Sequence, residues 1–276
     1  MKIFVTGATG FIGSHFLNEA HAVGHELHCI RRPQSQPRIP INQEPYWHTG
    51  SLEDDWSEIL SQCSVLVHFA SAGVSPQKAT MGDLIKYNIE YPTKLFERAA
   101  GQGIKKFLIT GSSAEYGRTG EKFNFIPTSA SLEPVTHYSA SKAAFFQIAC
   151  GLAATKHLKM VYARLFTIFG EGQFEENLWP SLKKAAFAGD DFQLTLGEQI
   201  RDFTPVTMAA KQIVKFLEFE SVIEGEIKIC HIGTGKPQTL REFAEYWWDV
   251  WGGTGILRFG ADPYRENEVM RFVPKI

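Results

Sequence analysis

The chain has 276 residues, of which 44% are hydrophobic and 21% are charged, and its formal net charge is -2 at pH 7. This composition is typical of a folded domain with a large core and argues against disorder. The charges form no basic stripe, so we expect no nucleic-acid partner. Short apolar runs such as VLVHFA fall far below the roughly 20 residues that span a bilayer. The N-terminus lacks a leader pattern, so we expect no membrane partner and a cytoplasmic protein.

The four cysteines are scattered along the chain, without a C-x-x-C pair or a histidine at ligand spacing: Cys29, Cys63, Cys150 and Cys230. We therefore predict reduced thiols and no metal site. The nine histidines are equally dispersed, which favours structural roles over catalytic ones.

Short β-branched segments alternate with longer helical patterns from Met1 to about Phe166. Strands are predicted at KIFVT, ELHCI, VLVHFA, KKFLIT and KMVYARLF. Helices are predicted from about Phe11, from about Asp83 to Ala100, and from the segment HYSASK onward. This alternation predicts parallel strands with crossover helices on both faces, which is a doubly wound α/β sheet of the Rossmann type.

The rhythm loosens beyond Phe166, where a Gly- and Glu-rich loop precedes a helix at about 178–188 and a short FQLTL segment. We expect a main α/β domain in residues 1–166 and a smaller C-terminal lobe in 167–202 and 233–276. Residues 203–232 contain a helical pattern and a strand pattern, and we predict that they return to the main sheet.

A glycine-rich loop, GATGFIG, follows the first predicted strand and opens the first helix. This order places backbone amides and a helix N-terminus where a pyrophosphate can bind, and a Cβ at the close-approach positions would obstruct it. A purely structural glycine turn is the alternative. We predict a bound dinucleotide, held by Gly7, Thr9, Gly10, Phe11, Ile12 and Gly13.

Tyr138 and Lys142 lie four positions apart in HYSASK, on one face of the predicted helix. An isolated pair of this kind is also typical of a surface helix with a snorkelling lysine. The preceding strand ends in TGSSAEYG, and its carboxyl end brings Ser112 and Ser113 to the same crevice. Hydride transfer at a carbinol carbon requires a proton at the carbinol oxygen, and Tyr138 is the predicted acid/base. Lys142 and a positively charged nicotinamide would both favour the phenolate.

Three motifs in this order, GxxGxxG, SSAEYG and YSASK, resemble those of the extended short-chain dehydrogenase/reductases, the NAD-dependent epimerase/dehydratase group that acts on nucleotide sugars. The resemblance covers essentially the whole chain and implies an enzyme whose smaller lobe binds substrate. It implies that Lys142 also holds the nicotinamide ribose and that Ser113, preferred to Ser112, hydrogen-bonds the substrate oxygen. It further implies cofactor contacts at Phe69 and Ala70, and substrate contacts at Ser75, Asn88, Asn177 and Arg201. For Ser75 and Asn88, an ordinary polar residue is the alternative.

Arg31 and Arg32 stand at the end of the second predicted strand, where an NAD enzyme commonly supplies an acidic residue for the ribose. Arginine forks suit a 2'-phosphate, so we predict NADP in preference to NAD. Two solvated arginines are the alternative. Further on, TGSLED resembles the family segment beside the adenine and predicts cofactor contacts at Ser51 and Leu52, although Ser51 stands where an Asp is usual.

Glu115 leaves the reaction open. In the family's 4,6-dehydratases a glutamate two residues after the active-site hydroxyl residue acts as a base beside the sugar C5, and Glu115 has that offset from Ser113. The segments GEQIRDF and YRENEVMRF look most like those of reductases and synthases for CDP- or GDP-linked deoxysugars. We therefore predict reduction of a nucleotide-linked 4-keto-6-deoxyhexose, with 4-epimerisation and then 4,6-dehydration as alternatives.

A non-catalytic NADP-binding sensor is an alternative from another class. The joint presence of a serine hydroxyl, Tyr138 and Lys142 argues against it, because a sensor has no need of them. The resemblance also implies a homodimer formed through the helices around 83–100 and 138–154.

Overall fold

A parallel sheet of seven strands forms the centre of the protein in the computed structural model, which describes residues 1–74, 78–266 and 268–276. The strands lie in the order β11-β6-β5-β4-β1-β2-β3. Their bounds are β1 (Lys2–Thr6), β2 (Glu26–Arg31), β3 (Tyr46–Thr49), β4 (Val65–His68), β5 (Lys106–Ser112), β6 (Lys159–Leu165) and β11 (Ile227–Ile232). Strand order reverses between β1 and β4, and such a switch point opens a crevice at the carboxyl ends of the strands. The predicted doubly wound α/β fold is confirmed.

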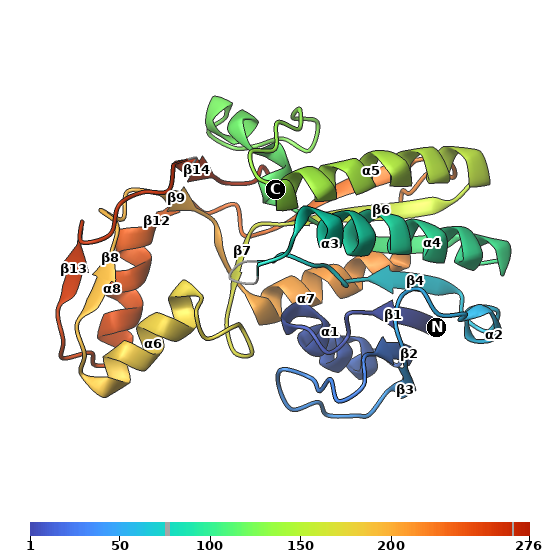
Figure 1. The fold of residues 1–276 in the computed structure, drawn as a ribbon, viewed down its shortest axis with the longest axis horizontal. Coiled ribbons are helices and arrows are strands. Elements are labelled where there is room, and N and C mark those ends of the chain that lie inside the picture. The colour runs from blue at the N-terminus through green and yellow to red at the C-terminus, as the bar shows by residue number, and fades with distance from the viewer. Residues whose placement is uncertain (75–77, 267) are drawn as a thin grey trace.

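Helices cover both faces of this sheet, as Figure 1 shows. Their bounds are α1 (Phe11–Ala22), α2 (Ser57–Leu60), α3 (Met81–Ile85), α4 (Tyr91–Gly101), α5 (His137–Lys156), α6 (Leu178–Ala188), α7 (Val206–Lys215) and α8 (Leu240–Val250). On one face α1 packs beside α7, and on the other α4 packs beside α5. Ile3 and Val5 of β1 join the core on the α1 and α7 side, whereas Phe4 joins the opposite core. Burial of both faces explains why the strands read as nearly continuous apolar runs.

Short helical turns connect several of these elements. They are the π-helical turn η1 (Lys86–Glu90) and the 3-10 turns η2 (Ser113–Tyr116), η3 (Arg118–Lys122) and η4 (Phe216–Glu218). The helix predicted at about 83–100 is therefore α3 and α4 with η1 inserted between them. η2 follows β5 directly, so it lies at the carboxyl end of the sheet.

The first turn of α5 is fixed by a capping box. The Thr136 hydroxyl accepts a hydrogen bond from the Ser139 backbone N–H at 3.1 Å, and the Ser139 hydroxyl accepts one from the Thr136 backbone N–H at 3.0 Å. This reciprocal pair satisfies orphan amides at the helix start. It sets where α5 begins, and with it the positions of Tyr138 and Lys142.

The smaller part of the molecule is built from short strands and two helices (Figure 1). The pairs and the triplet are β7 (Thr167–Phe169) with β10 (Phe203–Pro205), β8 (Phe192–Leu194) with β13 (Leu257–Phe259), and β12 (Gln238–Thr239) with β9 (Ile200–Arg201) and β14 (Arg271–Phe272). α6 and α8 share a core that includes Leu182, Ala244 and Trp248. β11 and α7 belong to the main sheet and its helical layer, while the domain division at residue 166 stays a prediction. No helix among the described residues has the length and apolar character to cross a membrane.

Candidate active site

A cleft of 1320 Å³ opens at the carboxyl ends of the central strands. Its walls come from the glycine loop, the segments that follow β2 and β4, the end of β5, the start of α5 and the loop before α6. All the residues predicted to bind the cofactor line it: Gly7, Thr9, Gly10, Phe11, Ile12, Gly13, Arg31, Arg32, Ser51, Leu52, Phe69, Ala70, Tyr138 and Lys142. The fold thus collects them in one place, and their contacts with a cofactor stay a prediction.

The glycine loop is too tightly packed to accept side chains. Gly7 has a φ of +71°, and a Cβ there would lie 2.5 Å from the backbone nitrogen of Ala70. A Cβ on Gly13 would lie 2.2 Å from the carbonyl oxygen of Gly7. Gly10, the N-cap of α1, offers no side chain to the first helical amides. Those amides at the helix N-terminus are suited to an anionic ligand.

Three arginines lie where the chain leaves β2. Arg31, Arg32 and Arg38 all line the cleft, and residues 30–38 contain no Asp or Glu. The Arg31 guanidinium lies over the Trp47 ring, 4.7 Å from its centroid, and that of Arg38 lies 3.8 Å from the centroid of Phe174. Stacked guanidinium groups keep their N–H donors available for an anion. Arg38 was not predicted from the sequence, because the chain beyond Arg32 carries no motif that fixes its path.

The predicted tyrosine and lysine meet a serine at the end of β5. Lys142 is only 4% exposed, and its Nζ donates a hydrogen bond to the backbone oxygen of Thr110 at 2.8 Å. The hydroxyls of Ser71 and Ser112 lie beside the Tyr138 phenol. The Ser112 hydroxyl oxygen accepts a hydrogen bond from the Ala114 backbone N–H at 3.2 Å, so its own proton is free for another acceptor.

Burial dominates the acidity of this group. Desolvation, and after it the nearby Glu115 carboxylate, raises the pKa of the Tyr138 phenol to about 12, while the Ser71 and Ser112 hydroxyls act in the lowering direction. Desolvation lowers the pKa of Lys142, and Glu115 opposes this shift. From the sequence, Lys142 was expected to lower the pKa of Tyr138. In the protein alone desolvation raises this pKa instead, so Tyr138 is a neutral phenol that can donate a proton.

Ser112 rather than Ser113 is the serine that lines the cleft. Ser113 and Glu115 are not among the described residues that form its walls. Ser113 begins the η2 turn, which leads the chain away from the end of β5. The predicted preference for Ser113 rested on its spacing from Tyr138, and spacing along the chain does not report the direction of a side chain at the end of a strand.

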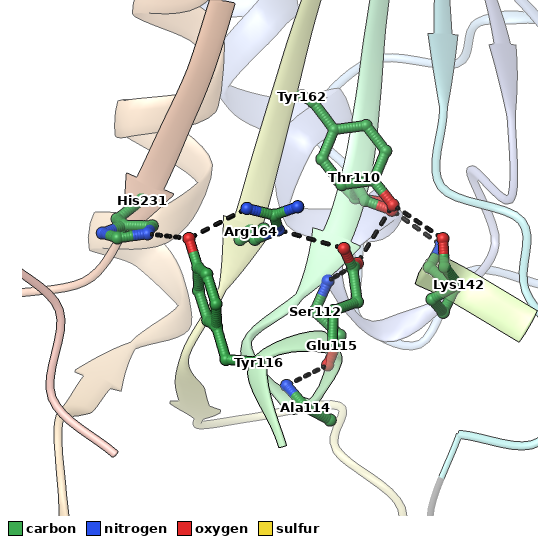
Figure 2. A network of polar contacts seen from close by, with 9 residues as sticks. All are labelled: Thr110, Ser112, Ala114, Glu115, Tyr116, Lys142, Tyr162, Arg164 and His231. Carbon is green, nitrogen blue, oxygen red and sulfur yellow. Dashed lines mark hydrogen bonds and ion pairs between the residues drawn. The ribbon is translucent and has the colours of Figure 1, made fainter. Parts of the chain in front are cut away.

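Glu115 lies in a buried network of polar groups, which Figure 2 shows. Its carboxylate accepts hydrogen bonds from the Ser112 backbone N–H at 2.7 Å and from the Tyr162 hydroxyl at 3.0 Å, and it forms an ion pair with the Arg164 Nε at 3.0 Å. Its exposed fraction is 0%. A base beside the substrate would require this carboxylate to leave its ion pair. The Ser112-x-x-Glu115 spacing is a capping-box signature and was the sequence signal for this arrangement.

Asn88 joins three segments beside the cleft. It lies on η1 and is buried, and its side chain accepts a hydrogen bond from the Ala72 backbone N–H at 2.7 Å. Its amide nitrogen donates to the Ser141 hydroxyl at 2.9 Å. Asn88 therefore ties the loop after β4 to α5, and the described cleft walls do not include it. The predicted substrate residue Ser75 lies outside the described residues.

The two predicted substrate residues of the smaller lobe have different surroundings. Asn177, the N-cap of α6, lines the cleft and makes no side-chain capping bond. Arg201 is not part of the described cleft walls. Its guanidinium forms an ion pair with Glu268 at 2.6 Å and donates to the Ile200 carbonyl oxygen at 3.0 Å. Their contacts with substrate stay predictions.

Comparison with known proteins identifies the family. Residues 3–230 match the model of the NAD dependent epimerase/dehydratase family, a region that contains the main sheet apart from the first residue of β1 and the end of β11. The chain belongs to the NAD-dependent epimerase/dehydratase family. The predicted family resemblance, and with it the prediction of an enzyme, is confirmed.

Individual members of the family are similar over nearly the whole chain. A CDP-abequose synthase of Salmonella muenchen is 24% identical, with 98% of this chain and 87% of the relative covered. A UDP-glucose 4-epimerase of Erwinia amylovora is 26% identical, with 99% and 89% covered. Among solved structures, a UDP-N-acetylglucosamine 4-epimerase from Methanobrevibacter ruminantium M1, in complex with UDP-N-acetylmuramic acid, has a TM-score of 0.86 at 24% identity and covers 100% of this chain and 89% of that one. The last likeness shows the fold.

The nicotinamide dinucleotide implied by this family fits the residues present. The glycine loop leaves close-approach space that a Cβ at Gly7 or Gly13 would fill, and the uncapped start of α1 presents amides to it. Arg31, Arg32 and Arg38 supply cations farther along the cleft. These groups would hold such a cofactor, and their contacts with it stay a prediction.

Proposed function

We propose that this protein reduces a nucleotide-linked 4-keto-6-deoxyhexose at the expense of a reduced nicotinamide cofactor. When bound, the cofactor supplies a hydride to the carbonyl carbon. Tyr138 donates the proton that the carbonyl oxygen requires, and the Ser112 hydroxyl donates a hydrogen bond that orients this oxygen. Lys142 lies one helical turn from Tyr138, and its side chain is held by a hydrogen bond to the backbone oxygen of Thr110.

The placement of Tyr138 beside the Ser112 hydroxyl in the cleft wall carries the proposal. A reductase needs a general acid at the start of its reaction, and a phenol with a pKa of about 12 is protonated across the physiological range. The same desolvation disfavours the phenolate that an alcohol oxidation needs, and this supports the reductive direction.

The position of Glu115 weighs against 4,6-dehydration. A dehydratase base must reach a carbon-bound proton of the substrate, but Glu115 is fully buried and is bound to Ser112, Tyr162 and Arg164. Breaking a buried ion pair costs on the order of 3–5 kcal/mol, so release of this carboxylate during each turnover is unfavourable.

A 4-epimerase is the second candidate, because UDP-glucose 4-epimerases are among the relatives that match most of the chain. An epimerase would use the same Tyr138 in both directions and would consume no cofactor. The non-catalytic sensor is less well supported, since Tyr138, Ser112 and Lys142 converge at the carboxyl end of β5.

The cofactor in this proposal is NADP in preference to NAD. The support is Arg31, Arg32 and Arg38 in the cleft wall and the lack of an acidic residue in 30–38. Arginine forks match a phosphate in geometry and charge. The protein should bind NADPH more tightly than NADH, and Arg31→Ala should reduce the difference between the two affinities. Tighter binding of NADH by the parent protein would overturn the proposed preference for NADP.

Nucleotide sugars and their 4-keto forms are the substrates to test. CDP-linked sugars come first, since two relatives are named CDP-abequose synthases, and Asn177 offers an amide at the substrate side of the cleft. Stoichiometric loss of NADPH absorbance with a 4-keto sugar would support reduction. Conversion without net consumption would instead support the epimerase.

Tyr138→Phe tests the role of the phenol. This variant should lose turnover by at least about 10³-fold and should keep its NADPH affinity, because it removes only a proton donor. Tyr246→Phe, on the exposed face of α8, is the matched control and should keep parental activity. Unchanged turnover in Tyr138→Phe would refute the assignment.

The predicted homodimer and cytoplasmic location are kept as part of the proposal. Sedimentation of the purified protein tests whether it is a dimer.

A further inference from the structure

The Glu115 carboxylate is held by three donors from two neighbouring strands. They are the Ser112 backbone N–H at the end of β5, the Tyr162 hydroxyl and the Arg164 guanidinium, the last two on β6. Gly111 makes room for this arrangement: a Cβ there would lie 2.1 Å from Tyr162 Cε1 and 2.7 Å from a Glu115 carboxylate oxygen. The site therefore requires a glycine at the position next to Ser112.

The network continues from Arg164 to the C-terminal segment. Arg164 Nη1 donates to the Tyr116 hydroxyl oxygen at 2.9 Å, and the Tyr116 hydroxyl contacts His231 Nε2 at 2.7 Å. His231 Nδ1 lies 3.1 Å from the Lys275 carbonyl oxygen, which assigns the proton to Nδ1 and makes Nε2 the acceptor for Tyr116. The Glu115–Arg164 pair is thus hydrogen-bonded to Tyr162 on the glutamate side and to Tyr116 on the arginine side, as Figure 2 shows.

One side of Glu115 faces the catalytic residues. In Figure 2 Glu115 lies between Arg164 and Lys142, and the Tyr162 hydroxyl bridges the Glu115 carboxylate and the Lys142 backbone oxygen at 3.0 and 3.3 Å. Ser112, which Glu115 holds by its backbone, lies beside Tyr138. The carboxylate is thus linked to the proton donor through Ser112.

We propose that Glu115 is a positioning residue for the proposed reduction: clamped by Arg164 and Tyr162, its carboxylate fixes Ser112 and places a buried negative charge next to Tyr138 and Lys142. This inference rests on the proposed function for its role in turnover. Glu115 itself touches neither substrate nor cofactor, and it acts through the groups that do.

The Glu115 charge raises the pKa of both Tyr138 and Lys142. A buried carboxylate disfavours a second negative charge nearby, which keeps Tyr138 protonated, and it favours the ammonium form of Lys142. Both directions agree with the shifts that Glu115 produces at these residues. The other titratable or charged groups at this end of the sheet are Lys142 on α5, Tyr162 and Arg164 on β6, His68 on β4 and Asp83 on α3. His68 is neutral, because burial lowers its pKa to about 3.

The test removes both charges of the pair and keeps its polar atoms. Glu115→Gln alone would leave Arg164 buried without a counter-charge, which commonly unfolds a protein. In the double variant E115Q/R164Q, amide groups can take over the bonds to Ser112 and Tyr116. The titration of Tyr138 is followed by NMR of ring-labelled tyrosine in the free protein and in its complex with oxidised cofactor, with Tyr138→Phe to assign the signal.

We expect the Tyr138 midpoint to fall by on the order of one pH unit in E115Q/R164Q. The alkaline limb of the kcat/KM profile for reduction should move to lower pH by the same amount, because reduction needs the protonated phenol. The matched control neutralises an exposed pair, Asp191 and Arg258, as D191N/R258Q, and should leave the Tyr138 titration unchanged. An unchanged midpoint in E115Q/R164Q would overturn the proposal.

A second variant covers the case in which E115Q/R164Q does not fold. E115L/R164M replaces the pair by apolar side chains of similar length, a change that buried pairs often tolerate. It should lower the Tyr138 midpoint in the same way, and it should lower kcat further than E115Q/R164Q because Ser112 loses the acceptor of its N–H. The NMR titration needs no substrate. Failure to reduce any 4-keto sugar would therefore refute the proposed function and leave the inference about Glu115 to be decided by the titration.

Discussion

Ser112 and Ser113 are adjacent in the sequence but have different surroundings. Ser112 lines the cleft beside Tyr138, whereas Ser113 starts the η2 turn. Ser112→Ala should lower kcat by about 10²-fold with little change in cofactor affinity, since it removes a donor to the substrate oxygen. Steady-state kinetics of reduction, with NADPH titration of each variant, provide the measurement.

Ser113→Ala is the matched control for this change and should keep kcat within a factor of a few. A larger loss of kcat in Ser113→Ala than in Ser112→Ala would instead support Ser113 as the catalytic serine, as predicted from the sequence. The residue types at this site could be predicted from motifs. Which of two neighbouring serines faces the cleft could not, because it depends on how Glu115 folds back on the Ser112 backbone under the constraint of Tyr162 and Arg164.

The glycine loop packs closely against the segment that follows β4. Gly7 and Gly24 both have positive φ, at +71° and +80°, but a Cβ on Gly7 would meet the backbone of Ala70, while one on Gly24 would meet nothing within 4 Å. Gly24→Ala should therefore cost about 1 kcal/mol of unfolding free energy from strain alone. Gly7→Ala should cost several kcal/mol and should also abolish dinucleotide binding.

Chemical denaturation and NADPH fluorescence titration of the two variants measure these effects. Equal losses of stability, or a Gly7→Ala protein that still binds NADPH with parental affinity, would contradict the role given to the loop. Gly24→Ala should bind NADPH normally, since Gly24 follows α1 and is not among the residues described in the cleft wall.

Elements with strong local signals could be predicted closely. The central strands alternate β-branched runs with helices, and α6 occupies the predicted 178–188. The π-helical turn that carries Asn88 was not predicted, because its inserted residue is stabilised by contacts with Ala72 and Ser141 rather than by local sequence. The strands of two or three residues in the smaller lobe were not predicted either, because their pairing partners lie far away in the sequence.

The two parts of the molecule are joined through buried polar groups. Asp202, between β9 and β10, is fully buried, and its carboxylate accepts hydrogen bonds from the Thr234 and Gly235 backbone N–H groups after β11. His231, at the end of β11, contacts the C-terminal segment through Lys275. The carboxyl end of the main sheet therefore anchors the smaller lobe, and the stability of the whole molecule depends on groups that titrate.

Two buried histidines should make the folded protein sensitive to acid. Burial lowers the pKa of His68 to about 3 and that of His231 to about 4, whereas an unfolded histidine titrates at about 6.5. As the pH falls below about 6.5, the unfolded chain takes up protons that the native protein does not, so stability present at neutral pH is lost. By about pH 5 each histidine should have cost roughly 2 kcal/mol of unfolding free energy.

Urea denaturation of the parent protein and of His231→Gln at several pH values measures this loss. The variant should be less stable at neutral pH, because Tyr116 and Lys275 lose their shared partner. Between about pH 6.5 and pH 4, the unfolding free energy of the variant should nevertheless fall less steeply, because unfolding of the variant takes up close to one proton fewer. Above about pH 7 the unfolding free energies of the two proteins should change with pH in parallel. Identical slopes in the acid range would mean that His231 takes up its proton equally in the native and unfolded states, and the Tyr116 contact would then have to survive with a charged imidazole.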